Sequence, residues 1–234
     1  VVLYDVGIAL QKLKDSNKNI IAIGDYFSRS GYYLASFADE IIMNPDGAIL
    51  VEGFGRSKLY YKSLLDKLKL DINIFKVGTF KSAVEPYLGN EMSDAAKEAN
   101  LAYLDVLWKS WKQVVARNRE MVPDDIQYLV DNADKVFTES ENSMAEALLD
   151  YGLVDKLLPR AKARTLLKEM FGESKDKKSF SSISGYEYFQ LIQSEKEMES
   201  SDEKIAVIVA RGTIVDGVQP PGTIGGDSTS RLIK

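Results

Sequence analysis

The sequence contains no histidine and no cysteine among its 234 residues, and these absences exclude several common kinds of active site. A Ser-His-Asp triad, a Cys-His pair and a metal centre ligated by histidine or cysteine cannot be built from this chain. Any acid-base chemistry must therefore use lysine, aspartate, glutamate or tyrosine. The sequence also lacks a run of about 18 apolar residues, so no transmembrane helix is expected within it.

The charge of the chain says little about partners. A net charge of −5 gives no reason to expect a nucleic acid, and the only basic cluster, Lys175–Lys178, is interrupted by Asp176, as in a solvated loop. The 45% hydrophobic and 28% charged content is typical of a globular protein with a substantial core. There is no initiator methionine, signal peptide or lipidation motif, so we expect a fragment of a longer protein.

Strand and helix patterns alternate at short spacing in the first part of the chain. The apolar runs Ile20–Ile23 and Glu40–Met43 predict buried strands, with a helix over Ser28–Ala38 between them. Ile72–Val77 alternates as a strand should, and it leads directly into the segment that contains Lys81. This alternation predicts an α/β fold with helices covering a sheet.

Glycine, proline and asparagine punctuate these patterns. Asn44–Gly47 predicts a turn that ends the strand at Met43, before a new apolar run, Ala48–Val51. A helix is expected from about Leu59 to Leu68. A further helix, Ser143–Leu149, is followed by Gly152, the expected C-cap glycine.

A long amphipathic helix is predicted from Ser93 to about Arg119. Ser93 is the expected N-cap, with Asp94 in the first turn to complement the helix dipole. Apolar residues recur there at spacings of three and four: Leu101, Leu104, Trp108, Trp111 and Val115. We interpret this stripe as a core or a subunit interface rather than a ligand site.

The sequence predicts a division into three parts. Residues 1–171 form a first domain, and residues 172–203, rich in serine, lysine and glutamate, form a linker with an aromatic patch of Tyr186, Tyr188 and Phe189. A second domain begins in residues 204–234, with a buried strand at Lys204–Val209 followed by Gly212–Gly217 and a glycine-bearing loop.

Lys81 is the candidate general base. It follows Gly78, at the expected start of a helical turn that Glu85-Pro86 ends. A lysine acts as a base only when neutral, and both burial and the positive end of a helix lower its pKa. Neighbouring side chains could exclude water from the amine or orient it: Phe80, Ala83, Val84, Thr79 and Ser82. The alternative from the residues alone is a surface lysine with a packed stem.

Serines in the segment Gly24–Ser36 admit two interpretations. A serine at the start of a helix after a buried strand could be a nucleophile, with backbone amides as its oxyanion hole. Ser28, Ser30 and Ser36 are equally well explained as caps and turn residues.

Three stretches resemble the signal peptide peptidase A (protease IV) family in its long, two-repeat bacterial form: Tyr32–Asp39, Tyr60–Lys69 and Val77–Pro86. The resemblance runs through most of the chain and includes Gly225–Thr229, in the loop that opens the second repeat. It implies a ClpP/crotonase-like spiral of ββα units with a helical extension. Residues 1–171 would be the amino-terminal repeat, and residues 204–234 the beginning of the catalytic-serine repeat.

The resemblance also implies a function. Members of this family are serine endopeptidases with a Ser/Lys dyad that degrade cleaved signal peptides. They act on the periplasmic side of the bacterial inner membrane and need no cofactor. We therefore expect peptide substrates, a homo-oligomer such as a tetramer, and a membrane contact through a segment absent from this chain.

The family motifs assign the two members of the dyad differently. Lys81 stands at the position of the general base. The family's serine lies in an Ala-Ser-Gly-Gly-Tyr motif, and alignment without gaps on Gly24 and Ala38 places that serine on Arg29. The resemblance thus implies that this chain carries the base, whereas the nucleophile comes from the second repeat, beyond Lys234.

Three alternatives remain open from the sequence. The chain could be self-sufficient through Ser30 and Lys81, although Ser30 lies one position away from the motif serine. It could be an acyl-CoA hydratase or isomerase, which share the crotonase fold. It could also be a non-catalytic scaffold half that shapes the assembly, with Trp108 and Trp111 at an interface.

Overall fold

The computed structural model describes residues 2–78, 81–140, 143–198, 209, 211–220 and 222–233. The chain divides into two compact units, Val1–Phe180 and Ser181–Lys234. Each unit is described by itself.

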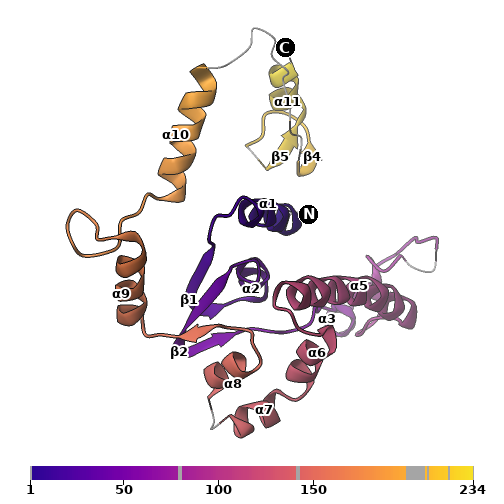
Figure 1. Ribbon diagram of the computed structural model, residues 1–234. Coiled ribbons are helices and arrows are strands. Elements are labelled where there is room, and N and C mark those ends of the chain that lie inside the picture. The colour runs from indigo at the N-terminus through magenta and orange to yellow at the C-terminus, as the bar shows by residue number, and fades with distance from the viewer. Residues whose placement is uncertain are drawn as a thin grey trace. The chain divides into compact units, whose positions relative to one another are not determined.

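The first unit is built around a small parallel sheet in the order β1-β2-β3 (Figure 1). These strands are β1 Ile21–Phe27, β2 Glu40–Ile49 and β3 Lys156–Leu157. The central strand β2 carries the fully buried Ile41, Ile42 and Met43. The helix α2, Arg29–Ala35, connects β1 to β2 and packs against both strands, as a parallel pair requires.

Strand β2 does not end at Met43, so the predicted turn at Asn44–Gly47 is wrong. Gly24 pairs with Met43 and Tyr26 pairs with Ala48, which leaves these four residues opposite Asp25 as a bulge. The Asp46 amide donates to Asn44 Oδ1 at 3.1 Å, and a Cβ on Gly47 would come within 2.5 Å of the Asp25 carbonyl oxygen. The turn residues therefore distort the strand locally, and pairing with β1 resumes at Ala48.

Ile72–Val77 does not form the predicted strand. The segment has no regular secondary structure and no ladder partner in the described part of the chain, and Phe75 is 96% exposed. Alternating side chains favour a strand only when a neighbouring strand satisfies the backbone hydrogen bonds. The sequence pattern is present here without that neighbour.

The long helix α5, Asp94–Asn118, confirms the prediction from Ser93 to Arg119. Ser93 is its N-cap, with the Ser93 hydroxyl accepting from the Ala96 amide at 3.3 Å. The apolar stripe divides in two: Trp111 is 4% exposed and lies in the core, whereas Leu101 is 67% exposed. Trp111 is therefore core within this unit and does not form an interface.

The other helices of the first unit surround this framework. They are α1 Val2–Asp15, α3 Lys62–Leu68, α4 Glu85–Leu88, α6 Pro123–Asp131, α7 Ala133–Glu139, α8 Met144–Asp150 and α9 Arg160–Phe171. Gly152 follows α8 with a φ of +73°, which confirms it as the C-terminal glycine.

Polar contacts tie the end of α8 to the rest of the unit. The Tyr32 hydroxyl donates to the Leu153 carbonyl at 2.6 Å, and burial raises the pKa of Tyr32. The Arg119 guanidinium at the end of α5 donates to the Gly152 carbonyl and to both carboxylate oxygens of Asp155. These contacts join α2, α5 and the residues that lead into β3.

The second unit contains α10 Gly185–Met198, β4 Thr213–Val215, β5 Thr223–Gly225 and α11 Gly226–Ile233. Strands β4 and β5 form a parallel pair. Most of the strand expected at Lys204–Val209 lies outside the described residues, and α10 falls inside the segment expected to be a linker. The observed elements agree with an α/β fold, while the ClpP/crotonase-like spiral and the domain bounds 1–171, 172–203 and 204–234 stay predictions.

Candidate active site

The serines near the start of α2 have structural contacts. Ser28 caps α2, its hydroxyl accepting from the Gly31 amide at 3.1 Å. Ser36 is buried, with its hydroxyl donating to the Tyr33 carbonyl and accepting from Asn118 Nδ2 at 3.0 Å. The capping interpretation therefore holds for Ser28, and Ser36 has no access to a substrate.

Arg29, where the resemblance places the family's serine, holds a neighbouring loop. Its Nη1 donates to the carbonyl oxygen of Gly53 at 2.7 Å, and its Cζ lies 3.7 Å from the centre of the Phe54 ring. The Arg29 carbonyl in turn accepts from Trp111 Nε1 at 3.2 Å. A guanidinium stays protonated in proteins and has no acceptor lone pair, so Arg29 cannot act as a nucleophile.

Lys81 lies at the surface, in a segment without regular structure. Its backbone amide donates to the Gly78 carbonyl at 3.4 Å, and its side chain lies beside Gly78, which has a φ of +107°. The predicted helical turn at Lys81 is wrong, since α4 begins only at Glu85. Pro86 lies in the first turn of this helix and does not end it, because proline is tolerated in a first turn, where the amide needs no helical partner.

The remaining features proposed for Lys81 are only partly visible. Thr79 and Phe80 lie outside the described residues. Ala83 is exposed and Val84 is half-buried. The described neighbours thus leave Lys81 exposed, and they do not bury its amine as expected.

Three contacts hold the segment that follows Lys81. The Lys58 ammonium donates to the Ser82 carbonyl at 3.1 Å, and the Tyr61 amide donates to the Pro86 carbonyl at 2.7 Å. The buried Glu85 carboxylate accepts from both the hydroxyl and the amide of Ser93. The hydrogen bond from the Ser93 hydroxyl is the main cause that lowers the pKa of Glu85, and burial opposes it.

The structure does not bring Ser30 and Lys81 together. Ser30 is exposed in the first turn of α2, and no hydrogen bond joins it to Lys81 in the described part of the chain. Sequence reasoning missed Lys58 and Glu85, which secure the lysine segment. For Glu85, the available signal was a glutamate beside a proline and among apolar residues, which indicates a buried carboxylate. The sequence around Lys58 contains no comparable signal.

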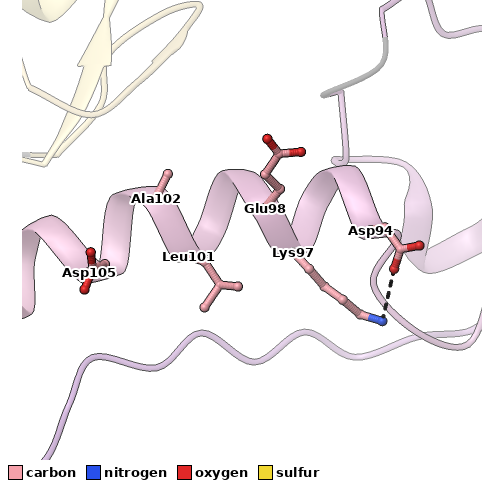
Figure 2. A pocket seen from close by; sticks show the side chains of 6 residues that line it. All are labelled: Asp94, Lys97, Glu98, Leu101, Ala102 and Asp105. Atoms are coloured by element: carbon pink, nitrogen blue, oxygen red, sulfur yellow. Dashed lines mark ion pairs between the residues drawn. The ribbon is translucent and has the colours of Figure 1, made fainter.

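The first half of α5 carries a shallow surface depression, shown in Figure 2. Lys97 forms an ion pair with Asp94 at 3.7 Å, and Leu101 lies further along the same helix. All the residues that line this depression come from α5: Asp94, Lys97, Glu98, Leu101, Ala102 and Asp105. Because it is open and contains no part of the Lys81 segment, it is not the candidate active site.

The described side chains and helices also bear on metal binding and on membrane insertion. Over the described ranges, no three or more aspartates and glutamates are grouped so that they could hold a metal ion. None of the helices in those ranges combines the length and the apolar character that crossing a bilayer requires.

Comparison with known proteins places the chain among peptidases. The family model described as "Peptidase family S49" matches residues 12–172, a range that includes Arg29, Lys81 and Glu85. Protease 4 of Salmonella typhi is 39% identical over 233 residues, which cover 98% of this chain and 36% of the relative. Protease 4 of Haemophilus influenzae is 36% identical over 233 residues, covering 98% of this chain and 37% of that protein.

A more distant relative comes from a plant. The chloroplastic serine protease SPPA of Arabidopsis thaliana is 22% identical over 216 residues, which cover 91% of this chain and 30% of that protein. The chain thus spans about a third of the length of the curated relatives that it matches. These matches give no support to an acyl-CoA hydratase or isomerase.

Proposed function

The chain belongs to peptidase family S49, and from this premise we propose that it supplies the general base, Lys81, to a serine endopeptidase with a Ser/Lys dyad. The observation that carries the proposal is the combination of the family match with the absence of histidine and cysteine. Because these 234 residues contain no histidine, a base supplied by this part of the protein must be another side chain, and a neutral lysine can serve. Lys81 is the residue at the family's base position.

The nucleophilic serine comes from a part of the protein outside these 234 residues. Arg29 stands where the resemblance places the family's serine, and its guanidinium donates a hydrogen bond to the Gly53 carbonyl. The exposed side chain of Lys81 supports this arrangement, because its amine is accessible to a group from elsewhere in the assembly. These residues alone are therefore expected to be inactive.

In the proposed reaction, the neutral amine of Lys81 removes the proton from the serine hydroxyl as the serine oxygen attacks the peptide carbonyl. Backbone amides near that serine stabilise the oxyanion. The ammonium of Lys81 then returns the proton to the leaving amine, and the C–N bond breaks to give an acyl-enzyme. Water, deprotonated by the same lysine, hydrolyses the ester and restores both groups.

The remaining parts of the proposal concern the biological context. The substrates are cleaved signal peptides, and the protein acts as a homo-oligomer, expected to be a tetramer. It works at the bacterial inner membrane with its catalytic part on the periplasmic side. The names of the two bacterial relatives support a protease, and the other statements rest on the family resemblance.

The test is the variant Lys81→Ala in the longer protein that includes the nucleophile. We expect kcat for peptide hydrolysis to fall by about 10²–10⁴-fold, the range that a general base contributes. Lys81→Arg should be equally inactive, because arginine keeps its proton. Lys67→Ala, which removes an exposed lysine of α3, is the matched control and should behave like the wild type.

Size-exclusion chromatography of the same variants tests whether assembly is preserved. Near-normal turnover by Lys81→Ala would contradict the proposal and favour a non-catalytic scaffold role for this part of the chain. Activity of the 234-residue chain alone, abolished by Ser30→Ala, would instead show that it is self-sufficient.

A further inference from the structure

Glu85 is a buried carboxylate four residues after the proposed base in the sequence, and the proton transfer does not use it. It is only 6% exposed, and among the described residues only Ser36 and Glu85 are both buried and polar or charged. Removing a carboxylate from water is costly unless hydrogen bonds or opposite charges compensate. The contacts of Glu85 therefore indicate what it is there to hold.

Its two oxygens are both directed at the residue that caps α5. The Ser93 hydroxyl donates to Glu85 Oε1, and the Ser93 amide donates to Glu85 Oε2 at 3.3 Å. The same Ser93 hydroxyl accepts from the Ala96 amide at 3.3 Å, so it belongs to the cap and to the Glu85 contact at once. Glu85 is thereby joined directly to the first turn of α5.

This arrangement completes a helix cap from outside the helix. In an ordinary capping box, a glutamate at the third helical position accepts from the backbone amide of the N-cap residue. In α5 that third position is Ala96, which has no acceptor side chain. Glu85 accepts from the Ser93 amide in its place, although it precedes Ser93 by eight residues and belongs to α4.

The contact also determines where the lysine segment lies. The Glu85 amide donates to the Ser82 carbonyl at 3.2 Å, and the Lys58 ammonium donates to the same oxygen at 3.1 Å. Ser82 directly follows Lys81. A short series of hydrogen bonds therefore leads from the N-terminus of α5, through Glu85, to the residue next to the proposed base.

Helix α5 provides a rigid support for this series. Its later turns are anchored in the core through Trp111 and Val115. The Lys81 side chain, in contrast, is exposed and has no hydrogen bond to any described side chain. Because no contact of its own side chain with the described residues positions Lys81, its amine can reach the correct distance from a serine only if the backbone of the Lys81 segment is fixed.

We propose that Glu85 is a positioning residue for the general base: its carboxylate fixes the Lys81 segment against the first turn of α5 through Ser93. This inference rests on the proposed function, because it assigns Glu85 a role only if Lys81 is the base. Glu85 itself touches neither the substrate nor the transferred proton.

The experiment compares three variants of the longer, active protein in steady-state peptide hydrolysis. Glu85→Ala removes both acceptors, and we expect kcat to fall by about 10–100-fold with KM within about threefold of the wild type, because misplacement of a catalytic group by about 1 Å has an effect of this size. Glu85→Gln keeps one acceptor and should restore most of the lost kcat. Ser93→Ala, which keeps the backbone amide, should lie between them.

Glu91→Gln is the matched control, since it removes an exposed carboxylate close by that pairs only loosely with Lys97, at 3.6 Å. It should leave kcat and KM unchanged. All rates are measured well below the unfolding temperature of each variant, determined by circular dichroism, so that loss of fold is not read as loss of kcat. If Glu85→Ala does not fold, the order of Glu85→Gln and Ser93→Ala carries the test.

The outcomes separate this inference from the function on which it rests. An unchanged kcat in the folded Glu85 and Ser93 variants, with Lys81→Ala inactive, overturns the role of Glu85 alone. Turnover by Lys81→Ala overturns the proposed function and this inference with it. A rise in KM at constant kcat would also contradict positioning, because it would assign Glu85 to substrate binding.

Discussion

The segments around Arg29 and Lys81, which we propose correspond to the two members of a Ser/Lys dyad, are held in opposite ways. At the start of α2, Arg29 is fixed by its own side chain, which donates to the Gly53 carbonyl and stacks on Phe54. The Lys81 side chain is exposed. Its segment is held by the hydrogen bonds that Lys58 donates to the Ser82 carbonyl and that Ser93 donates to Glu85.

This difference has a physical consequence. A side chain that is saturated with intramolecular contacts stabilises the fold but is not available for chemistry. A reactive side chain must stay accessible, so its position has to be set through the backbone around it. The first segment should therefore matter for stability, and the second for activity.

The largest expected effect on stability is at Trp111, which supports the start of α2. Its ring is 4% exposed, stacks on Trp108 and donates to the Arg29 carbonyl. Trp111→Ala should lower the free energy of unfolding by about 3–5 kcal/mol, the usual cost of truncating a buried large aromatic side chain. Urea denaturation measures this change. Leu101→Ala, on the exposed half of the same helix, is the control and should change the free energy of unfolding little. Similar losses in both variants would contradict the division of α5 into a buried and an exposed half.

A smaller loss is expected at Arg29. Arg29→Ala leaves the Gly53 carbonyl without its hydrogen bond and Phe54 without its cation, so we expect a loss of about 1–2 kcal/mol in the free energy of unfolding. Hydrogen exchange at residues 52–54 should become faster. Lys81→Ala provides the comparison, and it should change stability by less than about 0.5 kcal/mol because the side chain is exposed. Equal losses at the two positions would show that both segments serve the fold alike.

The smallest effect concerns the pH dependence of stability through Glu85. The Ser93 hydroxyl, and to a smaller extent the Ser93 amide, Lys76 and Lys58, lower the pKa of Glu85 despite its burial. A carboxyl whose folded-state pKa is depressed contributes stability above its unfolded pKa of about 4.3, and this contribution is lost as the pH falls through the folded-state value. Melting temperatures between about pH 3 and pH 6 should therefore fall less steeply in Glu85→Gln than in the wild type. The same slope in both proteins would show that Glu85 is not stabilised in its charged form.

Local patterns predicted much of this fold correctly. The long helix α5 with its Ser93 cap, the capped start of α2 at Ser28 and the glycine after α8 depend on interactions between residues three or four positions apart. Such interactions depend only on the types of nearby residues, so they can be predicted from the sequence. The apolar runs predicted β1 and β2 as strands, but burial was predicted correctly only for β2, since no residue of β1 is buried and Ile23 is 43% exposed.

Two of the incorrect predictions depend on a strand partner that is distant in the sequence, whereas the third concerns the local role of a proline. Asn44–Gly47 has the composition of a turn, but pairing with β1 carries the strand through it as a bulge. Ile72–Val77 alternates as a strand but lacks a ladder partner in the described part of the chain. Pro86 was assigned to the end of a helical turn, yet it lies in the first turn of α4.

By itself, the sequence determined which side chains in these 234 residues can transfer a proton: without histidine and cysteine they are lysine, aspartate, glutamate and tyrosine, and Lys81 is the base that we propose. Only the tertiary structure decided how the Arg29 and Lys81 segments are held. Arg29 is hydrogen-bonded to the loop at Gly53, and Glu85, in the Lys81 segment, is hydrogen-bonded to Ser93, the N-cap of α5. The reason is physical. Residue type sets which protons can move, whereas the contacts that position or immobilise a side chain are formed by groups that meet only when the chain has folded.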